Sequence, residues 1–229
     1  MYRERRAGRI AGAVVWASRS PAGAAPTRVL PDGCLDLLWS SRSGLLVAGP
    51  DRTAQLSRSV PGERWLGLRL PPGTGPAVFG VPADVLRDRR VPLDALWGRA
   101  AGEAAERLGD RPTAVALESV AVDRLVAVGG PDPLGCRIAA SLAAGASVAA
   151  TAAEVGLGPR ALHRRSQALF GYGPKTLARI LRMRRALALA RAGVPLAEVA
   201  VHCGYADQAH LTRDVRELAG VPPTRLLPG

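Results

Sequence analysis

A repeat near the C-terminus constrains the fold of this chain more than any other feature. Segments 161–177 and 210–226, which lie 49 residues apart, are identical at six positions. In the first copy these are Leu162, Arg164, Leu169, Gly171, Pro174 and Leu177. Upstream, at an offset of 48, Ala152 and Gly156 correspond to Ala200 and Gly204. Each copy therefore predicts a short helix, a glycine turn and a second helix, which is the helix-turn-helix pattern found in DNA-binding proteins.

The segment between the copies, Pro174–Arg191, predicts one uninterrupted helix. It begins with proline, has no internal Gly or Pro, and is followed by Gly193. Its 18 residues span about 27 Å, and one turn of duplex DNA is about 34 Å. Two recognition helices at its ends can therefore reach successive major-groove segments. Arg179, Arg182 and Arg185 recur along this helix, where they either contact DNA or form a solvated face.

Charge and composition favour a nucleic acid partner and disfavour several other classes. The 229 residues carry a net charge of +12, and residues 135–229 hold 13 basic and 5 acidic side chains. A polyanion is the natural partner of such a segment, although 30 of the 31 basic residues are Arg, which also fits a compositional bias. No uncharged apolar run approaches the roughly 20 residues of a membrane span. Three scattered cysteines without a CxxC pair indicate a reducing cytoplasm and no cysteine-bound zinc.

The first part of the chain reads as β-structure followed by helices. Short apolar runs at 14–16, 34–39, 45–48 and 64–70 predict strands of a small barrel or sandwich, with a hairpin turn at 40–44. Helices are expected at 82–87, 93–97, 100–108 and 113–128, and Gly129 to Pro133 form the clearest linker. The predicted organisation is α+β with two domains: a β-rich domain at 1–80, a helical connector at 81–130 and a DNA-binding domain at 131–229.

Specific phrases then resemble a known family. Residues 147–226 resemble the double helix-turn-helix domain of AraC/XylS bacterial transcriptional regulators in TAAEVGLGPRALHRR, FGYGPKTLARILRMRRALALA and AEVAVHCGYADQAHLTRDVRELAGVPPTRL. The upstream phrases LPDGCLDLLW, LLVAGP, LGLRLPPG and GVPADVLRDRRVPLDALWG are similar to one AraC subgroup. That resemblance implies a cupin-like N-terminal barrel. Ser166 departs from the family, which usually has a core aromatic residue there; either Phe170 fills the space or the first copy is looser.

The resemblance also implies which residues contact DNA. The residues expected to face base edges are Arg160, His163, Arg164, Gln208, Ala209, His210 and Arg213. Arg can bind guanine, Gln can pair with adenine, and Ala can touch a thymine methyl group. The residues expected to contact phosphates are Arg165, Lys175, Thr176, Thr212 and Arg216. Asp207 is expected to cap the second recognition helix.

The leading interpretation is a sequence-specific transcriptional regulator, cytoplasmic and associated with the nucleoid. Double-stranded DNA is its expected partner, with RNA polymerase and a second copy of the chain as further candidates. The N-terminal domain would sense a small organic effector through apolar residues such as Trp39, Trp65, Leu66 and Leu68, or would only dimerise. It contains no His, so no cupin-style metal cluster, cofactor or catalytic residue is expected.

Two alternatives remain open at this stage. One is a DNA-repair alkyl acceptor that uses Cys34 as its nucleophile. It would require an activated thiol, and normally a cysteine-bound zinc, which three isolated cysteines cannot supply. The other alternative is an architectural protein that binds all duplexes equally.

Overall fold

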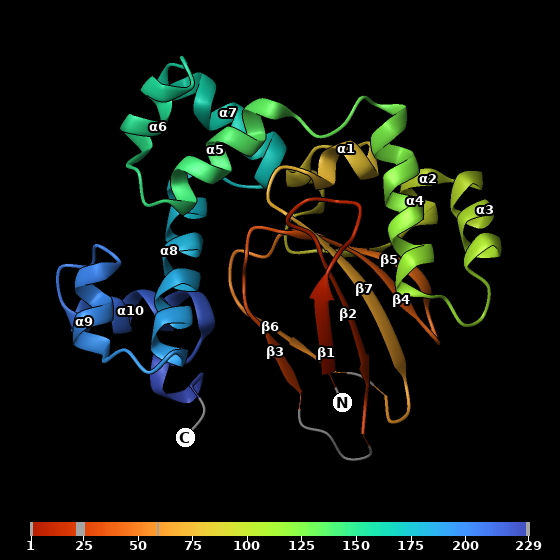
Figure 1. The fold of residues 1–229 in the computed structure, drawn as a ribbon, viewed down its shortest axis with the longest axis horizontal. Helices are drawn as coiled ribbons and strands as arrows, with labels where there is room; N and C mark the ends of the chain where they lie inside the picture. Colours follow the sequence, from red (N-terminus) through yellow and green to blue (C-terminus); the bar gives the residue numbers. More distant parts are fainter. Residues whose placement is uncertain (1, 22–25, 59, 228–229) are drawn as a thin grey trace.

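The computed structural model describes residues 2–21, 26–58 and 60–227 and contains two hydrophobic cores. The strands are β1 (Tyr2–Arg6), β2 (Val14–Arg19), β3 (Thr27–Val29), β4 (Leu35–Ser40), β5 (Gly44–Ala48), β6 (Gln55–Ser57), β7 (Arg64–Leu70) and β8 (Arg90–Pro92). The chain is β-rich before residue 93 and helical after residue 130, as the sequence predicted (Figure 1). No helix in the described ranges is long and apolar enough to cross a membrane.

Six strands form one antiparallel sheet in the order β1-β2-β7-β4-β5-β8, and β3 pairs with β6 in a second sheet. Alternation sets which face of the large sheet is buried. Leu37 pairs with Leu68 on one side and with Val47 on the other, and all three are fully buried. Because side chains alternate along a strand, the same face carries Leu35 and Leu70, which form part of the core.

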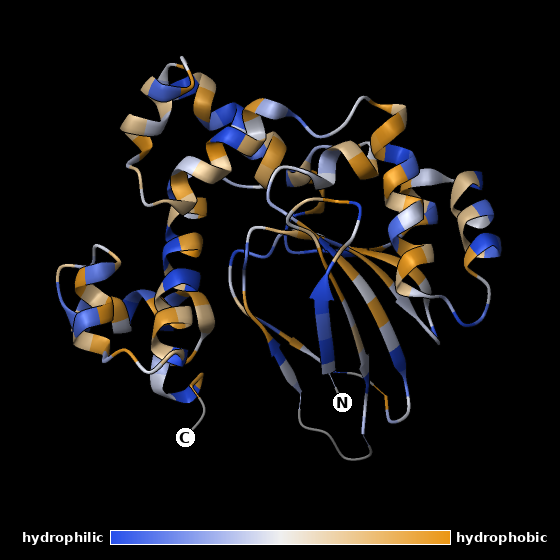
Figure 2. Cartoon of the chain, viewed as in Figure 1, coloured by the Kyte–Doolittle hydropathy of each residue, from blue (hydrophilic) through white to orange (hydrophobic). Residues whose placement is uncertain are grey.

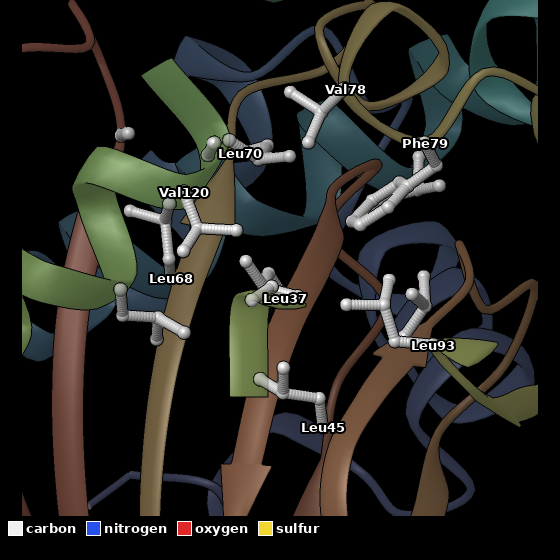
Figure 3. Close-up of a cluster of buried hydrophobic side chains, with 14 of the residues drawn as sticks. Leu37, Leu45, Leu68, Leu70, Val78, Phe79, Leu93 and Val120 are labelled. Atoms are coloured by element: carbon white, nitrogen blue, oxygen red, sulfur yellow. The ribbon is translucent and has the colours of Figure 1, made fainter. Parts of the chain in front are cut away.

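The helices that follow the sheet share its core. They are α1 (Gly75–Phe79), the 3₁₀ helix η1 (Ala83–Leu86), α2 (Asp94–Trp97), α3 (Arg99–Leu108) and α4 (Ala114–Ala127). Phe79 of α1 and Val120 of α4 gather with Leu37, Leu45 and Leu68 of the strands (Figure 3). Segment 81–130 thus differs from a separate helical connector, because β8 extends the sheet and the helices cover it.

The C-terminal part is built around one long helix. Its elements are α5 (Pro133–Ala143), α6 (Val148–Glu154), α7 (Pro159–Phe170), α8 (Pro174–Arg191), α9 (Leu196–His202), α10 (Gln208–Ala219) and the 3₁₀ helix η2 (Pro223–Arg225). The predicted helix Pro174–Arg191 is confirmed as α8. The pair α6–α7 lies at one end of α8 and the pair α9–α10 at the other (Figure 1). We call these pairs the first unit and the second unit.

Several short strands were not predicted, and their sequences explain why. All five residues of β1 are exposed and four are charged, so β1 has no apolar alternation (Figure 2). Its place in the sheet comes from backbone pairing with β2. The strands β3, β6 and β8 have three residues each, which is too short for a periodic signal. The predicted strands at 14–16, 34–39, 45–48 and 64–70 are confirmed as β2, β4, β5 and β7. Their ends differ from the predicted ones by at most three residues.

Candidate nucleic-acid interface

The turn inside each unit has the same backbone geometry. Gly156 and Gly204 both adopt left-handed conformations, with φ of 69° and 71°. In the first unit, the amide of Leu157 donates to the carbonyl of Ala152 at 2.9 Å. The equivalent bond in the second unit, from Tyr205 to Ala200, is also 2.9 Å long. The repeat in sequence is therefore a repeat in structure, with glycine at the position where a side chain would be strained.

The recognition helices α7 and α10 also end alike. Gly171 and Gly220 follow them with φ of 81° and 73°. Each glycine amide donates to a carbonyl in the last turn, Gln167 for α7 and Arg216 for α10, at 2.9 Å. Glycine in the left-handed conformation is the usual end of a helix because it carries no Cβ. Both helices have 12 residues, and they stop at equivalent positions of the repeat.

The starts of these helices differ. Asp207 caps α10, since its Oδ1 accepts from the amide of His210 at 2.6 Å, which confirms the predicted N-cap. Helix α7 starts at Gly158 and Pro159, and glycine offers no side chain to the first amides. The side chain of His210 also takes part in the second turn. Its Nδ1 accepts from the amide of Ala206 at 3.3 Å, and its ring lies edge-on to Tyr205.

Six of the seven predicted base-reading residues are exposed, three on each recognition helix. They are Arg160, His163 and Arg164 on α7, and Gln208, Ala209 and Arg213 on α10. His210 is half-buried by its contacts within the turn. Arg164 and Arg213 occupy equivalent positions in the repeat, two residues after the buried Leu162 and Leu211. Each unit thus presents one exposed arginine at the same point of its recognition helix.

The predicted phosphate-contacting residues lie in less uniform surroundings. Lys175 is exposed in the first turn of α8, and Arg216 is exposed on α10. Thr176 and Thr212 are half-buried. Arg165 forms an ion pair with Asp132, the N-cap residue of α5, with 2.6 Å between Nη2 and Oδ2. A phosphate would therefore have to compete with that carboxylate for Arg165.

The three regularly spaced arginines of α8 support neighbouring helices. Arg179 and Arg182 both pair with Asp214 of α10, at 2.7 and 3.1 Å, and Asp214 is only 4% exposed. The guanidinium of Arg182 also stacks on the ring of Tyr205. Arg185 donates to the carbonyl of Ala143 at the end of α5. Each of these arginines therefore has a partner within the protein, which neither sequence interpretation, DNA contact or a solvated face, included.

Asp214 was missed at the sequence level, although it organises the second unit. Besides the two arginines, it accepts a hydrogen bond from the hydroxyl of Tyr205 at 3.1 Å. Burial and the Asp214 carboxylate together raise the pKa of Tyr205. Helix α10 carries Asp214 and Glu217 beside Arg213 and Arg216, so its sequence does not mark one carboxylate as buried. The arginine partners of Asp214 lie 32 and 35 residues away, so spacing alone did not reveal the cluster.

The N-terminal part holds the C-terminal ends of both recognition helices. Arg87 donates from Nη1 to the carbonyl of Gly171 at 2.9 Å, just after α7. Arg28 donates in the same way to Ala219, the last residue of α10, at 2.9 Å. The amide of Ala54 donates to the carbonyl of Leu218 at 2.7 Å. These contacts are at the opposite ends of the helices from Arg160 and Gln208, whose side chains stay exposed.

The surroundings of Cys34 do not favour a reactive thiolate. Burial raises the pKa of Cys34 well above its ordinary value, and the carboxylates of Asp32 and Asp36 raise it further. Burial also raises the pKa of Asp36 to about 6, against the opposing effect of Arg69. The Nε of Arg69 lies 3.0 Å from Asp32. Across the described residues, no group of three or more His, Cys, Asp or Glu side chains could hold a metal ion.

Comparisons with known proteins match two segments of the chain. Residues 151–228 match the family model of a helix-turn-helix domain, and residues 13–92 match a domain of unknown function (DUF6597). No curated protein matches the sequence significantly.

Solved structures match the C-terminal part or the whole chain. ToxT from Vibrio cholerae is 9% identical, with 98% of this chain and 96% of that chain covered and a TM-score of 0.52. A probable AraC family transcriptional regulator from Rhodopseudomonas palustris is 22% identical over 42% of this chain and 100% of its own, with a TM-score of 0.37. The C-terminal domain of AraT, a response regulator from Geobacillus stearothermophilus, is 21% identical over 41% of this chain and 83% of its own, with a TM-score of 0.38. At 9% identity, the likeness to ToxT shows a shared fold over nearly the whole length.

Proposed function

We propose that this DNA-binding transcriptional regulator, whose residues 151–228 form an AraC-type helix-turn-helix domain, reads two successive major-groove segments with α7 and α10. The observation that carries the proposal is the equivalence of the two units. Their turns and helix ends have the same geometry, and Arg164 and Arg213 are exposed at equivalent points. Helix α8 spans about 27 Å between them, which is compatible with adjacent groove segments about 34 Å apart along the duplex.

Within this proposal, the exposed side chains near the start of each recognition helix read bases. Arg164 and Arg213 are assigned bidentate contacts with guanine, the commonest specific contact of arginine in the major groove. Gln208 is assigned to adenine and Ala209 to a thymine methyl group. Arg160, His163 and His210 are assigned supporting base contacts. Because the N-terminal part contacts the opposite ends of α7 and α10, it leaves these positions open to DNA.

A second set of residues is proposed to position the protein on phosphates. Lys175, Thr176, Thr212 and Arg216 lie beside the recognition helices or on α10 and carry polar or positive groups. Arg165 joins them once its ion pair with Asp132 is exchanged for a phosphate. Such contacts fix register without reading sequence. The proposed partner is therefore double-stranded DNA in the cytoplasm at the nucleoid, and RNA polymerase is the next partner to test.

Selection of bound duplexes from a random pool tests sequence-specific recognition. The expected result is enrichment of two short motifs whose centres lie about one helical turn, or 10 base pairs, apart. A variant with both Arg164→Ala and Arg213→Ala should fail to enrich them, whereas Arg99→Gln, on an exposed face of α3, should enrich them normally. Equal recovery of all duplexes by the unaltered protein would instead indicate an architectural DNA-binding protein.

We further propose that residues 131–229 form a domain that folds and binds DNA alone. Its core, from Ile138 to Ala219, is separate from the core between Ile10 and Leu125. Gly129 and Gly130, both with positive φ, precede the N-cap of α5 at Asp132. A fragment of residues 131–229 should show a helical circular dichroism spectrum with a cooperative thermal transition. An unfolded fragment would place the boundary elsewhere.

For the N-terminal part we propose sensing of a small organic effector or dimerisation, and no catalytic role. The alkyl-acceptor alternative requires a thiolate at Cys34, but burial and two carboxylates raise its pKa. A Cys34→Ser variant should bind DNA as the unaltered protein does, and neither protein should accept methyl groups from alkylated DNA. Detection of a methyl group on Cys34 by mass spectrometry, after incubation with alkylated DNA, would contradict this proposal.

A further inference from the structure

A cavity lies between the two cores, away from the recognition helices. Its volume is about 720 Å³, within the range of about 300–1,000 Å³ that is typical of small-molecule sites. Its wall comes from the β1–β2 loop at 9–11, residues after β7, α4, the linker at 129–131, α5 and α8. The cavity is therefore bounded by both parts of the molecule and by the linker that joins them.

The lining of the cavity is almost wholly apolar. Helix α4 contributes Val122, Leu125 and Val126, and α5 contributes small residues that include Ala139 and Ala140. Val126 is 75% exposed, which is unusual for a valine beside such a hollow. Small side chains on α5 leave the space that larger ones would fill. An apolar occupant would cover this surface and release the water in contact with it.

Arg9 is the single charged side chain among the described residues that line the cavity. Its backbone is fixed by Glu118 of α4, which is 2% exposed and accepts from the amides of Gly8, Arg9 and Ile10. The guanidinium is held by a hydrogen bond from Nη1 to Oγ of Ser119 at 2.7 Å. The cavity thus combines an apolar wall with one positioned cation, and a buried carboxylate keeps the loop in place.

We propose that a small apolar molecule with one anionic group binds in this cavity. Its apolar part would lie between α4 and α5, and its anion would pair with Arg9. The binding site is inferred from the cavity alone. That its occupant acts as an effector of DNA binding rests on the proposed function. A ligand in this position touches both parts of the molecule, so its affinity depends on how they are packed. The chemistry of the wall, with no second charge, excludes a polar sugar or a nucleotide as the preferred occupant.

Two fluorescent probes that differ only in charge test the site in the full-length protein. The first, 8-anilino-1-naphthalenesulfonate, carries a sulfonate, and the second, N-phenyl-1-naphthylamine, is the same scaffold without it. Both should bind saturably at one site per chain. Arg9→Gln should weaken the sulfonate probe by about three- to tenfold and leave the neutral probe unchanged, because only the ion pair is lost. The matched control Arg99→Gln, on α3 outside the cavity, should change neither affinity.

A cavity-filling variant tests the apolar wall. Ala140→Trp places a large ring in the space and should weaken both probes by about tenfold or more. Ala105→Trp, at an exposed site on α3, is the matched control. Unchanged binding in Ala140→Trp, or equal losses in the control, would overturn the proposal. The proposal would also be overturned if the protein formed a concentration-dependent dimer that Ala140→Trp abolishes and Ala105→Trp does not. That result would show that a second copy of the chain covers the cavity.

Cys136 gives a measurement that needs no substitution. It lines the cavity and is exposed, whereas Cys203 is buried and Cys34 is partly so. Alkylation of Cys136 by iodoacetamide, followed by mass spectrometry, should slow when either probe is saturating. An unchanged rate would overturn the proposal even if a variant failed to fold. DNA selection by the same samples reports on the proposed function separately, so failure of one does not imply failure of the other.

Discussion

The two helix-turn-helix units have the same backbone but differ in what supports it. Their turns, helix lengths and helix ends correspond residue by residue. In the first unit, the position after the exposed arginine is Arg165, which reaches outward to Asp132. In the second unit it is Asp214, which is buried between Arg179, Arg182 and Tyr205. The repeat therefore conserves geometry while one unit uses a buried charge cluster and the other does not.

The cores of the units differ in a compensating way. The first unit has Ser166 and Phe170 at positions where the second has Val215 and Ala219, and all four are buried. Residues four apart lie on the same helix face. The first unit thus pairs the small Ser166 with the large Phe170, and the second unit pairs the medium-sized Val215 with the small Ala219. Phe170 is fully buried and belongs to the C-terminal core.

The largest expected difference between the units comes from Asp214. Asp214→Ala leaves Arg182 and Tyr205 without their shared acceptor, while Arg179 keeps Glu217, and should destabilise α10 by about 2–3 kcal/mol. The equivalent change in the first unit, Arg165→Ala, breaks a half-exposed pair and should cost about 1 kcal/mol or less. Hydrogen exchange of peptides from α7 and α10 measures both. Equal losses of protection would mean that Asp214 is not the organising residue of the second unit.

The next effect concerns DNA and asks whether the units read bases equally. Arg164→Ala and Arg213→Ala should each weaken binding to the preferred site by about 1–3 kcal/mol through loss of a bidentate base contact. Each should relax preference at one or two base pairs, and the two sets should lie about one helical turn apart. Binding titrations on single-base variants of the selected site measure this.

Lys175→Ala is the matched contrast for these two variants. It should weaken binding similarly on all duplexes and reduce the dependence of log Kd on log salt by about one, because a phosphate contact is lost. If the arginine variants behave in the same way as Lys175→Ala, then Arg164 and Arg213 contact only the backbone of DNA. The fold would stand in that case, but the assignment of base readers would not.

A smaller effect is expected at the start of the recognition helices. Asp207→Ala removes the cap of α10 and should reduce its local stability by about 1 kcal/mol. Gly158 has extended backbone angles suitable for a cap but no side chain, so Gly158→Ser should stabilise α7 by a few tenths of a kcal/mol. Hydrogen exchange of the first turns measures both changes. No change in α10 on removal of Asp207 would show that the contacts of His210 suffice to hold the turn.

Strong local signals made the C-terminal part predictable from sequence. Proline and glycine delimit α8, and the repeat located both turns and the cap at Asp207. What could not be predicted depends on contacts between distant residues. The pairing of Arg179 with Asp214 joins two helices, and the bond from Arg28 to Ala219 joins two residues that are 191 positions apart in sequence. Strand β1 has no apolar pattern at all, so only its partner β2 defines it.

A last expected difference distinguishes the cores of the two units. Ser166 is fully buried, and its hydroxyl has no hydrogen-bond partner within the part of the chain that the structure describes. Burying an unpaired hydroxyl is unfavourable, so Ser166→Ala should be neutral or stabilise α7 by up to about 1 kcal/mol. At the equivalent position, Val215→Ala removes buried methyl groups and should destabilise α10. Hydrogen exchange of the peptides spanning residues 159–170 and 208–219 gives the sign of each change. Destabilisation by Ser166→Ala would mean that the hydroxyl is satisfied within its own helix, and the first unit would then be no looser than the second.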